Sequence, residues 1–199
     1  MDTDPGIALM LRVRNGDQAA FGLLYGRFQR QVHSFFYGLC GDAGTCKDLT
    51  QETFLRIWKF RGRYAATGSI LAYLLTFARY VWLEHCRSLR RHGQPSATPV
   101  DELLGSLLAP AQAGPATRAS SSEISDHILA ALRDLPDEQR MAFVLQAIEG
   151  LNAEEAASVM QCPIHTVRSR KILAVKKLRA ALHEVWSAER LQETFREVQ

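Results

Sequence analysis

The stretch "NAEEAASVMQCPIHTVRSRK", residues 152–171, predicts two helices joined by a tight turn. Asn152 is followed three residues later by Glu155, the spacing of a reciprocal N-terminal cap, so a short helix is expected from there to Met160. Pro163 can open the next helix, because the missing N–H of proline is not needed in a first turn. Two helices in this arrangement predict a helix-turn-helix, the motif whose second helix lies in the major groove of DNA.

The second of these helices is strongly basic, with six Lys and Arg residues and no acid between Ile164 and Arg179. The N-terminus of a helix already attracts anions through its unpaired N–H groups, so a DNA-reading surface is one interpretation. An amphipathic helix with an ordinary solvated basic face is the other. A helical projection predicts an inward stripe of Ile164, Val167, Ile172, Val175, Leu178, Leu182 and Trp186. It places His165, Thr166, Arg168, Ser169, Arg170, Lys176, Lys177 and Arg179 on the opposite side or its flank.

Helical periodicity extends through the rest of the chain, and no strand-like alternation stands out. Residues 93–122 are rich in Pro, Gly, Ala and Ser and predict a linker. The expected fold is all-α, with two small helical domains joined by that linker. Helices are expected from Asp17 to Leu39 and over 43–60, 69–91, 123–134, 136–149, 152–160 and from 163 onward. The expected domains are 10–92 and 123–186, followed by a C-terminal tail at 187–199.

Charge and aromatic residues are distributed unevenly. Residues 12–92 carry 13 Lys and Arg against 5 acids and hold 14 of the 17 aromatic residues, whereas residues 123–199 carry 10 against 12. A segment that is both basic and aromatic suits single-stranded nucleic acid, although aromatic side chains are also ordinary core residues.

Several other classes of protein are disfavoured. No apolar run is long enough to span a membrane, and the acidic N-terminus lacks a signal pattern, so a cytoplasmic protein without membrane insertion is expected. No nucleotide-binding, zinc-protease or serine-hydrolase motif occurs, so no enzymatic activity, cofactor or metal is expected. The four cysteines are interpreted as reduced thiols, with zinc binding or a redox switch as alternatives.

Three segments resemble one family. Residues 132–170, "LRDLPDEQRMAFVLQAIEGLNAEEAASVMQCPIHTVRSR", are similar to the −35-binding domain of bacterial extracytoplasmic-function sigma factors. Residues 48–60, "DLTQETFLRIWKF", and residues 69–91, "SILAYLLTFARYVWLEHCRSLRR", resemble the −10-binding, polymerase-clamping domain of the same family. The resemblance implies an alternative sigma factor that directs core RNA polymerase to promoters, aids initiation and is held by an anti-sigma factor. A stand-alone helix-turn-helix regulator is the alternative, but it leaves the N-terminal unit unexplained.

The resemblance also implies roles for individual residues. For the −35 element the candidates are His165, Thr166, Arg168, Ser169, Arg170, Lys171 and Leu173. For the −10 element they are Arg61, Arg63, Tyr64, Tyr73, Arg79, Tyr80 and Arg87, several of which also form a basic and aromatic face by helical projection. For the β′ clamp helices of core polymerase they are Asp48, Gln51, Glu52, Leu55 and Trp58, which remain on the outer side of the 43–60 helix unless a neighbouring helix covers them. The β flap of the polymerase is a further expected partner.

Some positions depart from the family pattern. Tyr73 replaces a tryptophan, Tyr80 replaces an asparagine, and Glu84 stands where aspartate is usual. His165 replaces a glycine, and Leu173 occupies a position where the family often has arginine. We therefore expect weaker general promoter affinity and atypical base preferences. In the linker, Asp101 and Glu102 are candidates to mimic RNA phosphates inside the polymerase.

Overall fold

The computed structural model describes residues 4–92 and 122–196. Every regular element of the described chain is a helix, which confirms the all-α prediction. The N-terminal unit contains α1 (Pro5–Arg14), α2 (Gln18–Cys40), α3 (Ala43–Lys59), a short 3₁₀ turn η1 (Arg61–Arg63) and α4 (Ile70–His92). The C-terminal unit contains α5 (Ser122–Arg133), α6 (Asp137–Phe143), a π-helical turn η2 (Val144–Ile148), α7 (Ala153–Met160) and α8 (Ile164–Arg196).

Helix α1 was not among the expected elements, and it begins before the expected domain boundary at residue 10. Its start has a local cause: the Asp4 carboxylate accepts a hydrogen bond from the Gly6 amide at 2.9 Å, and Pro5 opens the first turn. Its inner face buries Met10 and Val13 completely. These contacts make α1 part of the N-terminal core.

Helices α2, α3 and α4 pack on one another around an aromatic core. The predicted N-cap of α2 is confirmed, because the Asp17 carboxylate accepts from the Ala20 amide at 2.9 Å. Most of the predicted stripe of α2 is buried, including Phe21, Phe35 and Phe36. This core holds α3 and α4 with their polar faces outward.

The C-terminal unit differs from the expectation at two places. The helix expected over 136–149 is divided between α6 and the π-helical turn η2, and it ends at Gly150, whose φ of +75° favours glycine. Helix α8 continues to Arg196, so most of the expected tail at 187–199 extends the same helix. The linker residues 93–121, with Asp101 and Glu102, lie outside the described residues, as do 197–199.

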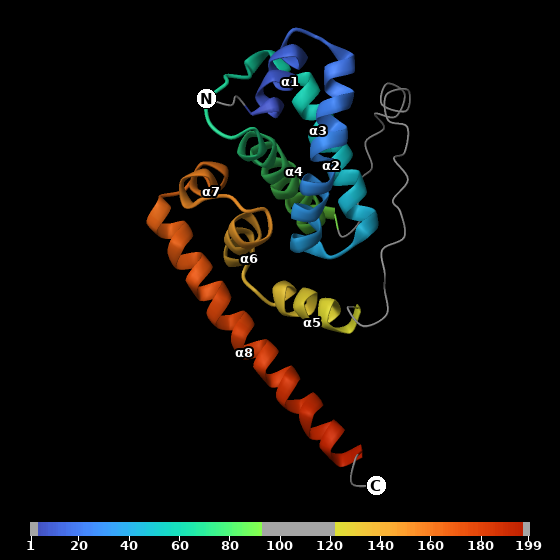
Figure 1. The fold of residues 1–199 in the computed structure, drawn as a ribbon, viewed down its shortest axis with the longest axis vertical. Helices are drawn as coiled ribbons and strands as arrows, with labels where there is room; N and C mark the ends of the chain where they lie inside the picture. The colour runs from blue at the N-terminus through green and yellow to red at the C-terminus, as the bar shows by residue number, and fades with distance from the viewer. Residues whose placement is uncertain (1–3, 93–121, 197–199) are drawn as a thin grey trace.

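The two units pack against each other. In Figure 1, α6 and α7 lie beside the N-terminal bundle, while the far half of α8 extends away from it. One continuous cluster of buried side chains includes Phe36 and Trp82 from the first unit and Val144 and Val159 from the second. A smaller cluster joins α5 to α8 through Leu132, Ala174 and Leu178. The linker prediction therefore did not anticipate that the two units share a core.

Candidate functional surfaces

The helix-turn-helix is formed by α7 and α8, as predicted. The Asn152 side chain accepts from the Glu155 amide at 2.9 Å, and the Glu155 carboxylate accepts from the Asn152 amide at 2.9 Å, so the capping box is confirmed. The turn passes through Gln161 in the left-handed conformation at φ 53°, and the Cys162 amide donates to the Ala157 carbonyl at 3.2 Å. The turn sets the direction in which α8 leaves the motif.

The face that α8 buries differs from the predicted stripe. Val167, Ala174 and Leu178 are buried against α5, α6 and α7, whereas Ile164 is 36% exposed and Ile172 is 67% exposed. The prediction was wrong at Ile164 and Ile172, because the buried face of α8 is centred on Val167, Ala174 and Leu178 instead. On the outer side lie the exposed side chains of His165, Arg168, Ser169 and Leu173, with Thr166 half-buried.

Arg170 does not lie on this outer face. Its guanidinium is half-buried and forms a salt bridge with the Glu138 carboxylate of α6 at 2.8 Å. It also donates to the Cys162 sulfur at 3.4 Å. In this arrangement Arg170 connects α8 to α6 and to the turn of the helix-turn-helix.

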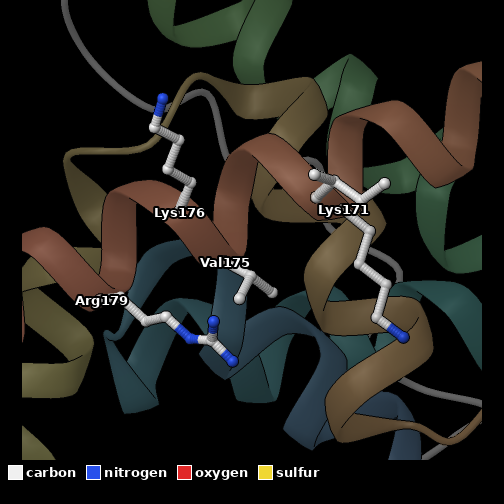
Figure 2. Close-up of a pocket in the computed structure, with 5 residues that line it drawn as sticks. Lys171, Val175, Lys176 and Arg179 are labelled. Atoms are coloured by element: carbon white, nitrogen blue, oxygen red, sulfur yellow. The ribbon is translucent and has the colours of Figure 1, made fainter.

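A shallow hollow lies further along α8. It has a volume of about 440 Å³ and is lined by Lys171, Ile172, Val175, Lys176 and Arg179. Figure 2 shows Lys171 and Arg179 on either side of Val175, with Lys176 extending to the other side of the helix. The hollow is apolar at its base and bordered by cations.

The exposed face of α4 carries cations around one aromatic ring. Tyr80 is 48% exposed, and the half-buried Arg79 guanidinium lies 5.9 Å from the centre of its ring. Arg87, Arg90 and Arg91 are exposed further along the helix. This surface combines positive charge with a ring that is available for stacking.

The other two candidate tyrosines lie deeper. Tyr64 is only 4% exposed, and its ring centre lies 4.8 Å from that of half-buried Tyr73 in an edge-to-face arrangement. Burial raises the pKa of both phenols. The Tyr64 ring is therefore not available for stacking on a base in this structure.

The η1 turn is held by cation–π contacts. The Arg61 guanidinium lies 4.3 Å from the Trp58 ring centre and donates to the Trp58 carbonyl at 2.8 Å. The Arg63 guanidinium lies 5.2 Å from the ring of Phe60, and Arg63 is exposed. Of the two arginines, Arg63 is the one that faces solvent.

The polymerase-contact candidates share one side of α3 with unequal exposure. Asp48 is exposed, whereas Gln51, Glu52, Leu55 and Trp58 are half-buried. The Trp58 ring packs at 5.0 Å, centre to centre, on Phe21 of α2, so a neighbouring helix covers part of it. The surface is thus partly polar and partly apolar.

Sequence reasoning did not identify Arg56, which joins α3 to α4. Its guanidinium donates to the Glu52 carboxylate at 2.5 Å and to the Glu84 carboxylate at 2.6 Å. The hydrogen bond and charge of Arg56 lower the pKa of Glu84. The spacing of Glu52 and Arg56, four residues apart on one helix, indicates the first contact, but nothing local indicates Glu84.

The seam between the two units was also not predicted from the sequence. The Arg140 guanidinium donates to the Leu39 carbonyl at 2.5 Å, and Arg133 donates to the Gly41 carbonyl at 3.1 Å. A Cβ atom on Gly38 would lie 2.9 Å from a methyl group of Val144, so α2 and η2 approach closely there. Helix α4, which carries the exposed arginines, packs directly against α7 of the helix-turn-helix.

Comparison with known proteins matches each of the two units to a family model. Residues 24–92 match the family model described as Sigma-70 region 2, and residues 125–178 match the model described as Sigma-70, region 4. The chain belongs to the sigma-70 family. Its relatives place this sigma factor in the extracytoplasmic-function group, as the sequence resemblance implied.

Two curated relatives illustrate the similarity. The RNA polymerase sigma-H factor of Pseudomonas aeruginosa is 28% identical over 182 residues, which cover 87% of this chain and 92% of the relative. The ECF RNA polymerase sigma-E factor of Escherichia coli (strain K12) is 29% identical over 167 residues, which cover 81% and 86%.

Two solved structures share the fold. CnrH, solved in complex with the cytosolic domain of CnrY, aligns with a TM-score of 0.69 at 20% identity, covering 91% of this chain and 99% of CnrH. The sigma factor RpoE, solved with the anti-sigma factor NepR from Bartonella quintana, aligns with a TM-score of 0.60 at 22% identity, covering 80% and 94%.

The family membership settles the class of function. This sigma factor directs core RNA polymerase to promoters and takes part in transcription initiation. The alternative of a stand-alone helix-turn-helix regulator is wrong, because the region 2 match covers the N-terminal unit that such a regulator would lack. Within the described chain, no helix is long and apolar enough to cross a membrane, and no three metal-ligating side chains gather into a site.

Proposed function

We propose that the two regions of this sigma factor divide promoter recognition between α8 and the α4 surface. The observation that carries the proposal is that one chain exposes a basic helix-turn-helix face and a separate face of arginines around Tyr80. Residues 123–186 would bind the −35 element as closed duplex, and residues 10–92 would bind the −10 element as it melts. The sigma factor would act by binding alone, in the cytoplasm, and would catalyse no reaction itself.

For the −35 element, the exposed residues of α8 are the direct candidates. His165, Arg168, Ser169 and Leu173 face solvent, with Thr166 beside them. Arginine can form two parallel hydrogen bonds with guanine or bind a phosphate. Arg170 contributes to direct contact only if it exchanges Glu138 for DNA, and otherwise it positions the helix. Lys171 would add positive charge at the side of the same face.

For the −10 element, Tyr80, Arg63 and Arg87 are the most accessible candidates. A ring that stacks on an unpaired base contributes about 1–3 kcal/mol, which offsets the cost of unstacking that base from the duplex. Arg61 and Arg79 would support this surface from their half-buried positions. Tyr64 and Tyr73 would shape the wall beside the η1 turn.

For polymerase, the outer side of α3 remains the candidate surface for the β′ clamp helices. Asp48, Gln51 and Glu52 offer polar contacts, while Leu55 and Trp58 offer apolar area at their exposed edges. Aromatic side chains are frequent among the residues that carry most of an interface's binding energy. The region 4 unit would contact the β flap.

The packing of region 2 on region 4 also supports control by a partner. The −10 and −35 elements lie about 25 base pairs apart, or roughly 85 Å of straight duplex. In the described structure α4, which carries the −10 candidates, packs against α7, and α7 packs against α8, which carries the −35 candidates, so only one helix separates the two DNA surfaces. The regions must therefore separate to bind a promoter, and an anti-sigma factor that binds the packed form would keep the sigma factor inactive. The helices of residues 123–155 and the α3 surface are its candidate docking places.

Reconstitution tests the proposed function. The full-length chain is mixed with bacterial core RNA polymerase, and transcripts are mapped from the DNA upstream of its own gene. We expect initiation at a discrete start site that depends on both proteins. A chain that binds this DNA alone but never directs polymerase to it would contradict the proposal.

A further inference from the structure

Two thiols meet where α2 ends and α3 begins. Cys40 is the last residue of α2 and Cys46 lies in the first turns of α3, and their sulfur atoms are 3.4 Å apart. Gly41, at φ 66°, allows the sharp turn between the helices, and the Asp42 carboxylate caps α3 by accepting from the Thr45 amide at 2.7 Å. Both thiols are free. The turn therefore holds two reduced cysteines side by side.

The geometry is close to that of a disulfide. A disulfide bond is about 2.05 Å long, so the two sulfur atoms must approach by roughly 1.4 Å, which side-chain rotation can supply. Cys40 is half-buried, whereas Cys46 is completely buried behind it. A small oxidant can thus reach the Cys40 thiol, and the Cys46 thiol lies close enough to react with it afterwards.

The electrostatics favour reaction at Cys40. The hydrogen bond with Cys46 is the main cause that lowers the pKa of Cys40 to about 7. A backbone hydrogen bond at Asp42 and the charge of Arg133 act in the same direction, against burial and the negative charge of Asp42. The pKa of Cys46 is raised, because its proton is held in the hydrogen bond to Cys40 and its site is buried. The thiolate is the reactive form of cysteine, so Cys40 is the nucleophile of the pair.

We propose that Cys40 and Cys46 form a reversible intramolecular disulfide when this sigma factor meets a peroxide. The Cys40 thiolate attacks one peroxide oxygen, the O–O bond breaks, and hydroxide leaves while Cys40 becomes a sulfenic acid. The Cys46 sulfur then attacks the Cys40 sulfur and the S–O bond breaks, and the departing hydroxide takes the Cys46 proton as water. Two thiols lose two electrons and two protons in total, and a small dithiol reverses the reaction by exchange.

The pair adjoins the seam between the two regions. Leu39 and Gly41, the neighbours of Cys40, are the residues whose carbonyls accept hydrogen bonds from Arg140 and Arg133 of region 4. Oxidation removes the thiolate charge of Cys40, one of the two negative charges near Arg133, and draws the two sulfur atoms together across the turn that presents both carbonyls. Disulfide formation therefore loosens the packing of region 2 on region 4. This inference concerns the packed form and does not depend on which promoter the protein reads.

The other two cysteines serve as controls. Cys86 lies close enough to Cys40 to interact electrostatically, but its burial raises its pKa and makes it less reactive. The Cys162 sulfur lies in the turn of the helix-turn-helix and accepts a hydrogen bond from Arg170. Within the described chain, neither of these two sulfur atoms contacts another sulfur.

The test uses the full chain treated with a small excess of hydrogen peroxide. We expect free thiols to fall from four to two and the Cys40- and Cys46-containing peptide to lose two hydrogen atoms in mass. Cys40→Ser and Cys46→Ala should each abolish the bridge, while Cys86→Ser should leave it intact. Circular dichroism before oxidation verifies that each variant is folded. Four remaining thiols, a disulfide-linked dimer, or a sulfinic acid at Cys40 without a bridge would each overturn the proposal.

A second measurement addresses the seam. Small-angle X-ray scattering should show a larger radius of gyration for the oxidised wild-type chain than for the reduced chain, with no such change in Cys40→Ser. A dithiol should restore the reduced value. A bridged protein with an unchanged radius would overturn the coupling between the thiol pair and the packing of the two regions.

Discussion

At the scale of single residues, burial distinguishes candidates that look alike in the sequence. Arg168 and Arg170 are two positions apart, yet Arg168 faces solvent and Arg170 is paired with Glu138. Tyr80 and Tyr64 differ in the same way, at 48% and 4% exposed. An exposed side chain can meet DNA without first breaking an internal contact, so its substitution should report on binding alone.

Arg168→Ala should weaken promoter binding of the holoenzyme across sequences. If Arg168 contacts a phosphate, the slope of log affinity against log salt becomes shallower by about 0.9. Arg30→Ala, which removes a charge that is also exposed but lies on α2, is the control. Binding measured by fluorescence anisotropy over a salt series checks this, and identical slopes for wild type and Arg168→Ala would remove Arg168 from the DNA contact.

Glu149 makes the packed structure sensitive to pH. Its half-buried carboxyl follows η2, and burial raises its pKa to about 7 although the Ser34 hydroxyl of α2 partly offsets this. One of its oxygens has no hydrogen-bond partner among the described residues. An acid whose pKa is raised in the folded state destabilises that state once it ionises, so stability falls as pH rises from about 4.5 through 7.

Glu149→Gln should remove this pH dependence. At pH 8 the variant should be more stable than wild type by about 1–2 kcal/mol, allowing for partial exposure of the site, and the difference should disappear near pH 4.5. Denaturant unfolding at the two pH values measures it. If wild type and Glu149→Gln differ in stability by the same amount at both pH values, ionisation of Glu149 does not destabilise the fold.

At the scale of elements, each candidate surface belongs to a helix with a second structural task. Helix α3 presents its outer side to solvent while Arg56 ties it to Glu84 of α4. The same helix packs Trp58 on Phe21 of α2. Trp58→Ala therefore removes core packing together with any polymerase contact. Substitution of a polar residue on the same side of α3 tests the polymerase contact with less effect on the core.

Gln51→Ala should weaken binding to core polymerase with little change in thermal stability. Gln51 is half-buried and its side chain makes no hydrogen bond within the described chain, so its loss should leave the fold intact. Gln18→Ala, the same change at an exposed position on α2, is the matched control. Titration of labelled sigma factor with core polymerase measures the affinity, and equal affinities for both variants would move the contact away from this part of α3.

At the scale of the whole molecule, region 2 packs on region 4, and the proposed function requires this packing to open before the promoter is bound. Helix α2 approaches η2 closely at Gly38, and the absence of a side chain on this glycine leaves the room that Val144 occupies. The connection from residue 93 to residue 121 has a maximum reach of about 100 Å, which is enough for regions separated by the length of a promoter spacer.

Gly38→Leu should separate the two regions. A Cβ at this position meets Val144 at 2.9 Å, whereas one at Gly26 of the same helix meets nothing within 4 Å, so Gly26→Leu is the matched control. We expect a larger radius of gyration and tighter core binding for Gly38→Leu only. If both variants remain as compact as wild type, the packed arrangement does not depend on this contact.

Features with local causes were predictable. The caps of α2 and α7 depend on Asp17 and on the Asn152–Glu155 pair, side chains that bond to amides within three residues, and both are as expected. The helix-turn-helix and the family resemblance likewise come from contiguous segments. The predicted inward face of α8 was wrong at Ile172, which is exposed. Helix α8 has more apolar residues than its neighbours cover, and periodicity alone cannot tell which of them are buried.

The amino-acid sequence by itself determined the helices, their caps, the helix-turn-helix and the class of protein, because these depend on interactions within one segment or on motifs read along it. The tertiary structure alone decided which arginine faces solvent, which tyrosine is buried and how region 4 packs on region 2. It also brought Cys40 and Cys46 together next to Gly41, whose carbonyl accepts a hydrogen bond from Arg133. Such contacts join residues that are distant along the chain or separated by a turn, and only the competition among whole helices for burial selects them.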